Sequence, residues 1–208
     1  MRFSHSHKLM LISNWKCGCS TIAELFAPIT EFDWDTRAEC RRIFGKDYDE
    51  MAHYPAKLMR QEFARLGWDF AEYTSISEVR NPWARAVSLY ANVSRVGFEG
   101  SFEDFVINEL PTWQSGLQRR WNSYEMFHER GRRIVDYIIR IEHLEEELRP
   151  VVERHWPDLQ LDYTMRSNTG NHKPFRDYYT DKTSALVAEF FAYDIETFGY
   201  RFEDENAG

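Results

Sequence analysis

Short apolar runs and amphipathic stretches follow one another along this chain. The runs Leu9–Ile12 and Ile134–Ile141 predict buried β-strands, and Tyr73–Val79, which is rich in Thr, Ile and Val, predicts another. Apolar residues spaced at i, i+3 and i+4 predict helices over 22–28, 56–67, 102–109 and 142–155. This alternation indicates an α/β fold with a central, mainly parallel sheet flanked by helices.

Two further helices are predicted from their caps. Asn81-Pro82 is typical of a helix start, with Asn as the N-cap and Pro at the first helical position. The helical period after it places Arg85, Ser88 and Asn92 on a different face from the expected buried residues, which are Trp83, Ala86, Val87 and Tyr90. Near the end of the chain, Thr180 caps a final helix that we expect to continue to Gly199.

The remaining segments show no sustained period. Residues 1–8 look like a polar lead-in to the first strand, residues 30–55 like loop and short helix, and residues 111–133 are rich in Trp, Arg and polar side chains. Because there is no internal repeat or obvious linker, the 208 residues predict a single domain, 1–208.

Composition narrows the class of protein. The net charge of −8 argues against a general nucleic-acid binder, although a small anion needs only a local cationic pocket. The three cysteines are too few for a disulfide framework and suit a reducing compartment. No apolar run approaches the ~20 residues that span a bilayer, and the N-terminus lacks a signal-peptide pattern. We therefore expect a soluble, cytoplasmic protein without a membrane span.

The strand Leu9–Ile12 leads into a candidate ligand loop. It is followed by a turn that contains Lys16 and Gly18, by the hydroxyl residues Ser20 and Thr21, and by a helix start. Such a turn forms an anion site because backbone N–H groups and the helix dipole favour negative charge there. We expect this loop to hold a phosphate or sulfate group.

A metal site is the alternative interpretation of this region, with His5, His7, Cys17 and Cys19 as ligands. Zinc-binding cysteines usually have two to four residues between them, whereas only Gly18 separates Cys17 from Cys19. Small residues in a tight loop are the simpler interpretation, so we expect no metal. The same two cysteines are also poor candidates for nucleophiles, although a helix N-terminus lowers the pKa of a thiol.

The order of residues in the loop differs from that of a Walker A motif, in which Lys-Ser/Thr follows the last Gly. Here Lys16 precedes Gly18, an order that resembles the 5′-phosphosulfate loop of sulfotransferases that use 3′-phosphoadenosine 5′-phosphosulfate (PAPS). The segment Val79–Tyr90 (VRNPWARAVSLY) closely resembles the 3′-phosphate element of that family. In that family an Arg at a strand end and a Ser on the following helix bind the 3′-phosphate. Arg80 and Ser88 match these two residues in identity and in spacing.

Two later segments resemble the carbohydrate-type (family 2) sulfotransferases. Phe175–Thr180 (FRDYYT), followed by Tyr193–Ile195 (YDI) and Phe198–Tyr200 (FGY), looks like the end of that domain. Tyr137–Leu144 (YIIRIEHL) looks like its strand-Glu-x-Leu segment. The resemblance covers most of the chain, with only a loose match over 30–72. It implies a three-layer, P-loop-like α/β fold and sulfuryl transfer without a metal or a covalent intermediate.

The resemblance also implies roles for individual residues. Lys16 would contact the bridging oxygen of the leaving group, and the 5′-phosphate would be held by the loop residues Cys17, Gly18, Cys19, Ser20 and Thr21. Arg80 and Ser88 would hold the 3′-phosphate, with Lys173 as a further phosphate contact. The family's base is a His upstream of the 3′-phosphate element in some members, which indicates His53; His172 is the alternative.

The acceptor would be a hydroxyl of a carbohydrate or glycoconjugate. Trp113 and Trp121 could stack on a sugar, and an acidic acceptor could bind the arginines at 119, 120, 130, 132 and 133, although core packing and a solvated face are the simpler interpretations. Two other functions stay open. One is a P-loop-type small-molecule kinase, which would need magnesium, and the other is a non-catalytic nucleotide-binding module.

Overall fold

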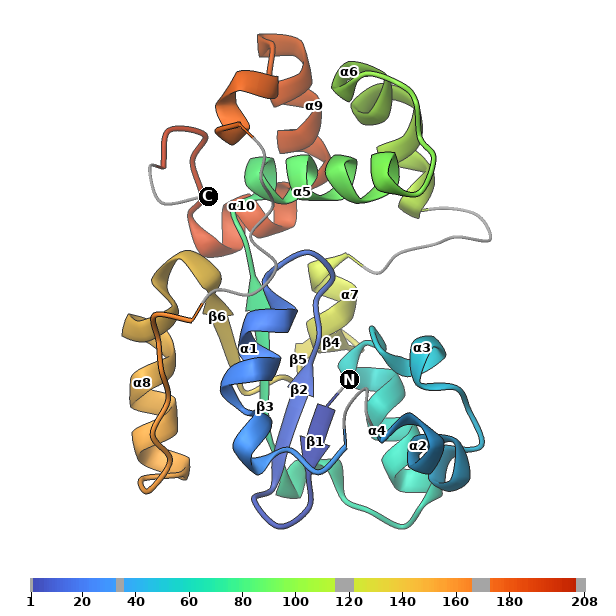
Figure 1. Ribbon diagram of the computed structural model, residues 1–208, viewed down its shortest axis with the longest axis vertical. Helices are drawn as coiled ribbons and strands as arrows, with labels where there is room; N and C mark the ends of the chain where they lie inside the picture. Colours follow the sequence, from blue (N-terminus) through green and yellow to red (C-terminus); the bar gives the residue numbers. More distant parts are fainter. Residues whose placement is uncertain (1, 33–35, 115–121, 166–172, 205–208) are drawn as a thin grey trace. The chain divides into compact units, whose positions relative to one another are not determined.

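The computed structural model describes residues 2–32, 36–114, 122–165 and 173–204 (Figure 1). Contacts divide the chain into two compact units. The first contains Met1–Val79 and Glu125–Asn168, and the second contains Arg80–Tyr124 and Thr169–Gly208. Each unit is thus built from two separate segments of the chain, and the single domain expected from the sequence stays a prediction.

The first unit is organised around a four-stranded sheet with the order β1-β2-β3-β6. Its parallel strands are β2 (Leu9–Ile12), β3 (Thr74–Val79) and β6 (Tyr137–Arg140), and β1 (Arg2–Ser4) lies antiparallel to β2. This confirms the predicted α/β fold with a mainly parallel sheet. Because the three parallel strands run the same way, their carboxyl ends meet at one edge, where α/β proteins bind ligands.

The other elements of the first unit are, in chain order, α1 (Cys19–Leu25), η1 (Ala27–Ile29), α2 (Arg37–Phe44), α3 (Tyr48–Met51), α4 (Ala56–Arg65), η2 (Phe70–Glu72), β4 (His128–Glu129), β5 (Arg132–Arg133), η5 (Ile141–His143) and α8 (Leu144–His155). The helix α7 (Ser123–Phe127) begins at the end of the second unit and continues into the first. Within the described ranges, no helix combines the length and the apolar character needed to cross a membrane.

Helices cover both faces of the sheet. Successive residues of a strand point to opposite faces, so apolar side chains on both faces have to be buried. Leu9 and Ile76 share one core with apolar residues of α1 and α8. Phe3 lies on the other face, where its ring packs edge-on against Phe44 of α2 and Phe63 of α4. Figure 1 shows α1 and α8 on one side of the strands and α2 and α4 on the other.

Several sequence predictions are wrong in their bounds. The helix expected over 22–28 is α1, which begins at Cys19 and ends at Leu25. Two further differences depend on tertiary contacts. Residues 1–8 are more than a lead-in, since β1 buries Phe3, which stacks on Phe32 with ring centroids 4.3 Å apart. The strand predicted over Ile134–Ile141 contains only β6, because Asp136 bonds to the side chain of Ser75 and Ile141 already begins a 3-10 turn. Both segments are governed by partners that lie far away in the chain.

The central strand β3 is unusually polar, and each of its buried polar side chains bonds to a neighbouring strand or to the residues just outside it. Ser77 Oγ donates to the carbonyl oxygen of Ile12 at 2.5 Å. Asp136 Oδ2 accepts hydrogen bonds from the N–H and the hydroxyl of Ser75, at 2.8 and 2.7 Å. Buried polar groups are tolerated when they are hydrogen-bonded, which explains a Ser- and Glu-containing strand in the middle of a sheet.

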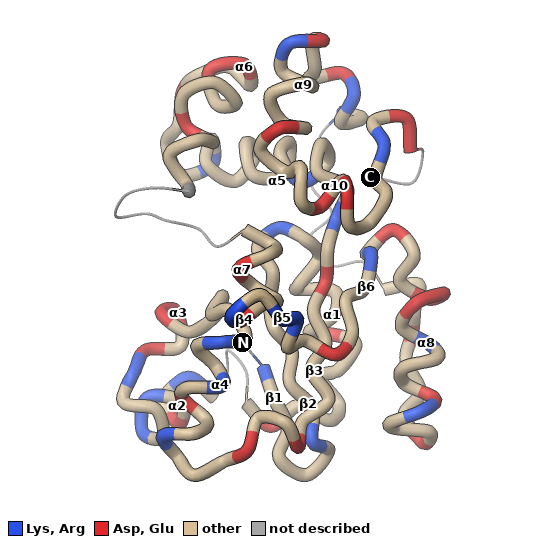
Figure 2. The backbone as a smooth tube through the Cα atoms, turned by 180° about the vertical axis from the view of Figure 1, so that it is seen from behind, with Lys and Arg blue, Asp and Glu red and all other residues tan. Residues whose placement is uncertain are grey.

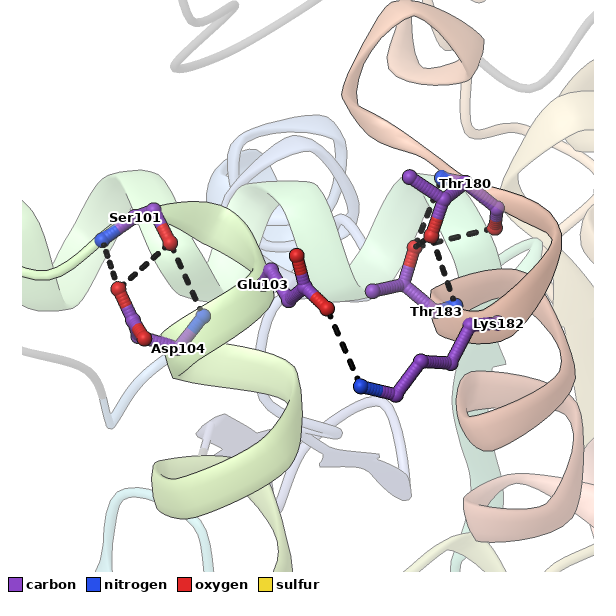
Figure 3. Close-up of polar contacts among 6 residues, drawn as sticks. All are labelled: Ser101, Glu103, Asp104, Thr180, Lys182 and Thr183. Carbon is purple, nitrogen blue, oxygen red and sulfur yellow. Dashed lines mark hydrogen bonds and ion pairs between the residues drawn. The ribbon is translucent and has the colours of Figure 1, made fainter.

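The second unit is helical. Its elements are α5 (Pro82–Arg95), α6 (Phe102–Asp104), the π-helical turn η3 (Phe105–Glu109), η4 (Leu110–Gln114), η6 (Phe175–Tyr178), α9 (Asp181–Phe190) and α10 (Ala192–Phe198). Thr180 caps α9 through a capping box with Thr183, as predicted, and Ser101 forms a similar box with Asp104 (Figure 3). The ion pair between Lys182 and Glu103, at 3.2 Å, joins the two capped helices.

The predicted final helix is divided into α9 and α10, and a second difference from prediction concerns Arg85 of α5. Arg85, which we expected on a face apart from the buried one, is only 4% exposed, and Asp194 of α10 is 2% exposed. The Arg85 guanidinium lies 3.5 Å from Asp194 Oδ2 and donates to Ser123 Oγ at 3.2 Å. Burial raises the pKa of Asp194, while Arg85 and Ser123 oppose that rise. Helix α5 is therefore buried on more than one face.

The carboxylate of Glu31 binds the turn between β1 and β2. Its carboxylate accepts hydrogen bonds from the N–H groups of His5 and Ser6 and from the hydroxyls of Ser4 and Ser6. Burial alone would raise the pKa of Glu31, but these bonds outweigh it and lower the pKa from 4.5 to about 2. A lowered pKa stabilises the folded state above the unfolded value, and this contribution disappears as the pH falls from 4.5 towards about 2.

We therefore expect Glu31→Gln to lower the free energy of unfolding by about 1–2 kcal/mol at pH 7, because an amide accepts fewer and weaker hydrogen bonds. Urea unfolding at pH 7 and at pH 3 measures this loss, which should shrink at the lower pH. Glu99→Gln, at an exposed position, serves as the control and should leave stability unchanged. An equal loss at both pH values would contradict the role of the Glu31 charge.

Candidate functional site

The loop after β2 adopts a conformation that is costly for the residue at its centre. The N–H of Cys17 donates to the carbonyl oxygen of Asn14 at 3.2 Å, which closes a tight turn around Trp15 and Lys16. Lys16 has a φ of 62°. A left-handed backbone costs a residue with a Cβ about 1–2 kcal/mol, and such strain often marks functional positions. Among the described residues other than glycine, Lys16 shares this conformation with Lys8 and Arg130.

Gly18 lets this loop approach the end of β6. Its φ is 95°, and a Cβ at this position would lie 2.6 Å from Cγ1 of Ile141, the residue directly after β6. Any side chain would therefore force the loop away from the carboxyl edge of the sheet. Gly18 is also the N-cap of the seven-residue helix α1, whose first bond runs from the Ile22 N–H to the Gly18 carbonyl at 3.2 Å.

The other loop residues differ in what they offer to a ligand. The side chains of Cys17 and Thr21 are buried, whereas Cys19 and Ser20 are half-buried. Burial, followed by the nearby carboxylate of Glu78, raises the pKa of the Cys19 thiol. A raised pKa keeps the thiol protonated, so this position suits a small loop residue better than a nucleophile. Of the two hydroxyl residues in the loop, Ser20 is more exposed to solvent than Thr21.

The structure brings His53 to this loop, although the two are 40 residues apart. His53 lies in the connection between α3 and α4, and its Nδ1 is 3.0 Å from the carbonyl oxygen of Ser13. Because a carbonyl oxygen can only accept, Nδ1 carries the hydrogen, and Nε2 of the neutral ring is the basic nitrogen. The ring centroid lies 6.4 Å from that of Trp15.

Glu78 belongs to the same region and was not among the predicted site residues. It is 1% exposed near the carboxyl end of β3, and its Oε1 accepts a hydrogen bond from the N–H of Asn14 at 2.7 Å. The available signal in the sequence was a carboxylate inside an otherwise β-branched and small-residue strand. His53 and Glu78 thus both bond to the loop that carries Lys16 and Gly18.

Arg80 and Ser88 belong to the second unit. Arg80 is half-buried and directly follows Val79, the last residue of β3. Asn81 is the N-cap of α5, as predicted, since its side chain accepts hydrogen bonds from the N–H groups of Trp83 and Ala84. Ser88 is half-buried on α5. The helix that carries the proposed 3′-phosphate element is therefore well anchored at its start.

The remaining candidates fall into separate places. Lys173 is exposed in the second unit, with its Nζ 5.3 Å from the ring centroid of Tyr178. Trp113 is buried and packs edge-on against Phe105, which makes it a core residue. Exposed arginines of the hairpin β4–β5 give this hairpin its basic character (Figure 2); they are Arg130, Arg132 and Arg133. His172, Arg119, Arg120 and Trp121 lie outside the described residues.

Neither a metal centre nor a known relative helps to assign the site. Among the residues that the structure describes, no three His, Cys, Asp or Glu side chains gather as a metal-binding group. His5 and His7 are instead bonded to Tyr73 and to Ser4 and Ser6, respectively. No protein-family model, curated protein or solved structure matches this chain.

Proposed function

We propose that this protein is a sulfotransferase that moves a sulfuryl group from PAPS to a hydroxyl of a carbohydrate or glycoconjugate. The observation that carries this proposal is the strained Lys16 turn, which follows a central parallel strand and whose preceding residue Ser13 binds His53 Nδ1. A cation held at a conformational cost, with a histidine bonded to the same loop, fits a reaction that builds negative charge on a leaving group.

The proposed reaction is a single in-line displacement. The acceptor oxygen forms a bond to sulfur while the bond between sulfur and the bridging phosphate oxygen breaks, and the electron pair leaves on that oxygen. Lys16 stabilises the negative charge that develops there, and the acceptor's proton moves to His53 Nε2. Because alignment and charge stabilisation supply most of the catalysis in such transfers, two side chains on a rigid loop and its neighbour suffice.

The nucleotide roles rest on the sequence resemblance. In this proposal the loop from Cys17 to Thr21 holds the 5′-phosphate, largely through the backbone N–H groups that follow Cys17, since the Cys17 N–H already donates to Asn14. Binding through the backbone suits the buried side chains of Cys17 and Thr21. Arg80 and Ser88 hold the 3′-phosphate, and Lys173 supplies a further cation. A P-loop-like architecture and a cytoplasmic location belong to the same proposal.

Nucleotide selectivity tests this function without knowledge of the acceptor. In isothermal titration calorimetry, 3′-phosphoadenosine 5′-phosphate (PAP) should bind about 10- to 100-fold more tightly than adenosine 5′-phosphate, because a charged hydrogen bond to the 3′-phosphate is worth about 1.5–3 kcal/mol. Arg80→Ala should remove most of this preference. Arg95→Ala, an exposed position at the end of the same helix, should retain it.

Equal affinities of the wild-type protein for the two nucleotides would refute the proposed function. A preference that survives Arg80→Ala would remove Arg80 from the site.

Sulfate transfer from PAPS in the presence of excess EDTA should proceed at the full rate, whereas a kinase-type reaction that needs magnesium would stop.

A further inference from the structure

The point at which the Lys16 loop leaves the sheet is held by a reciprocal pair of side chains. Regular pairing of β2 with β3 ends at Ile12 and Ser77. Beyond it, the N–H of Asn14 donates to Glu78 Oε1 at 2.7 Å, and Asn14 Nδ2 donates to the carbonyl oxygen of Glu78 at 3.1 Å. Each residue thus uses its side chain to satisfy the other's backbone.

We propose that Glu78 is a positioning residue of the sulfotransferase site, acting with Asn14 as a clamp that fixes the origin of the Lys16 turn. This inference rests on the proposed function. Asn14 is fully buried and Glu78 is 1% exposed, so neither side chain is available to a ligand. Asn14 also accepts the turn-closing bond from Cys17 through its carbonyl oxygen, which links the clamp directly to the strained residue Lys16.

We expect Glu78 to act through geometry rather than through its charge. Its carboxylate raises the pKa of Cys19, whereas Lys16 lowers it, so both charges act on the loop. A buried negative charge beside an anion-binding loop weakens anion binding, because Coulomb interactions are strong away from water. Glu78 therefore favours anion binding only if its hydrogen bond to Asn14 contributes more than its repulsion of the anion costs.

A second clamp in the same sheet offers a matched control. At the opposite edge, Asp136 Oδ2 accepts from the N–H and hydroxyl of Ser75, and the Asp136 N–H donates to Ser75 Oγ at 2.9 Å. This pair also ties neighbouring strand ends by reciprocal side-chain bonds, but it lies at the amino ends of β3 and β6. A variant of Asp136 therefore separates loop positioning from general sheet stability.

The test compares Glu78→Ala, Glu78→Gln and Asp136→Ala in the full-length protein. PAP affinity is measured by calorimetry, and backbone hydrogen exchange is followed over residues 13–21 without nucleotide. We expect Glu78→Ala to weaken PAP binding by about 10-fold or more and to speed exchange in the loop, because the Asn14 N–H loses its buried acceptor. Glu78→Gln keeps an acceptor and removes the charge, so it should bind PAP at least as tightly as the wild type.

Asp136→Ala should leave both PAP affinity and loop exchange at wild-type values. If Glu78→Ala behaves like Asp136→Ala in both measurements, Glu78 is a structural residue and the inference is overturned. Absence of PAP binding by the wild type refutes the proposed function instead, while loop exchange still reports on the clamp. If Glu78→Ala does not fold, Asn14→Ala is the milder variant, and unchanged loop exchange in it would overturn the clamp.

Discussion

Replacing Lys16 with Gly should lower the rate of sulfate transfer by about 10²–10³-fold without destabilising the protein. The lost cation would no longer stabilise the leaving phosphate oxygen, and removal of one such group typically lowers kcat by about 10²–10³-fold. Relief of the left-handed strain contributes about 1–2 kcal/mol, against about 0.5–1 kcal/mol for the greater freedom of Gly in the unfolded chain. The free energy of unfolding should therefore stay the same or rise by up to about 1.5 kcal/mol.

Lys8 provides a matched control for this prediction. It is another lysine with a positive φ, 50°, and it lies in the turn between β1 and β2. Lys8→Gly relieves the same kind of strain but should leave transfer unchanged, even though it removes an exposed ion pair with Glu72. Transfer of radiolabelled sulfate from PAPS to a panel of oligosaccharides measures activity, and urea unfolding measures stability. Full activity of Lys16→Gly would exclude Lys16 from catalysis.

Substitution of His53 should depress turnover by about 10²–10⁴-fold, the range typical of a general base. Two variants separate this role from loop anchoring. Asn places an N–H donor near the position of Nδ1, so His53→Asn keeps the bond to the Ser13 carbonyl oxygen but has no basic Nε2. Gln extends towards the Nε2 position and is equally non-basic. If His53 is the base, both variants lose turnover and His53→Asn keeps the wild-type affinity for PAP.

Recovery of turnover by His53→Asn would show that His53 only anchors the loop. His155→Asn is the control, because His155 is likewise hydrogen-bonded through Nδ1, which lies 3.2 Å from Thr74 Oγ1, while its Nε2 lies 3.0 Å from the Tyr137 hydroxyl. Those partners lie at the amino ends of β3 and β6, away from the carboxyl edge that carries the Lys16 loop. Turnover of His155→Asn should therefore match that of the wild type.

Several elements could be predicted because a few neighbouring residues determine them. The strand Leu9–Ile12 has the predicted bounds, Asn81 caps α5, and Thr180 caps α9. The positions of Lys16 and Gly18 in a turn between a strand and a helix were also predicted correctly. In each case the responsible interactions span at most about one helical turn or one strand, which a local pattern can record.

By itself, the sequence thus determined the class of fold, the N-caps of α5 and α9, and the loop that carries Lys16. Only the tertiary structure decided which distant groups serve that loop. Glu78 bonds to Asn14 across 64 residues, His53 reaches Ser13 across 40, and the burial of Arg85 depends on Asp194. The physical reason is that a hydrogen bond or an ion pair between distant residues leaves no period in the chain and forms only once strands and helices have packed.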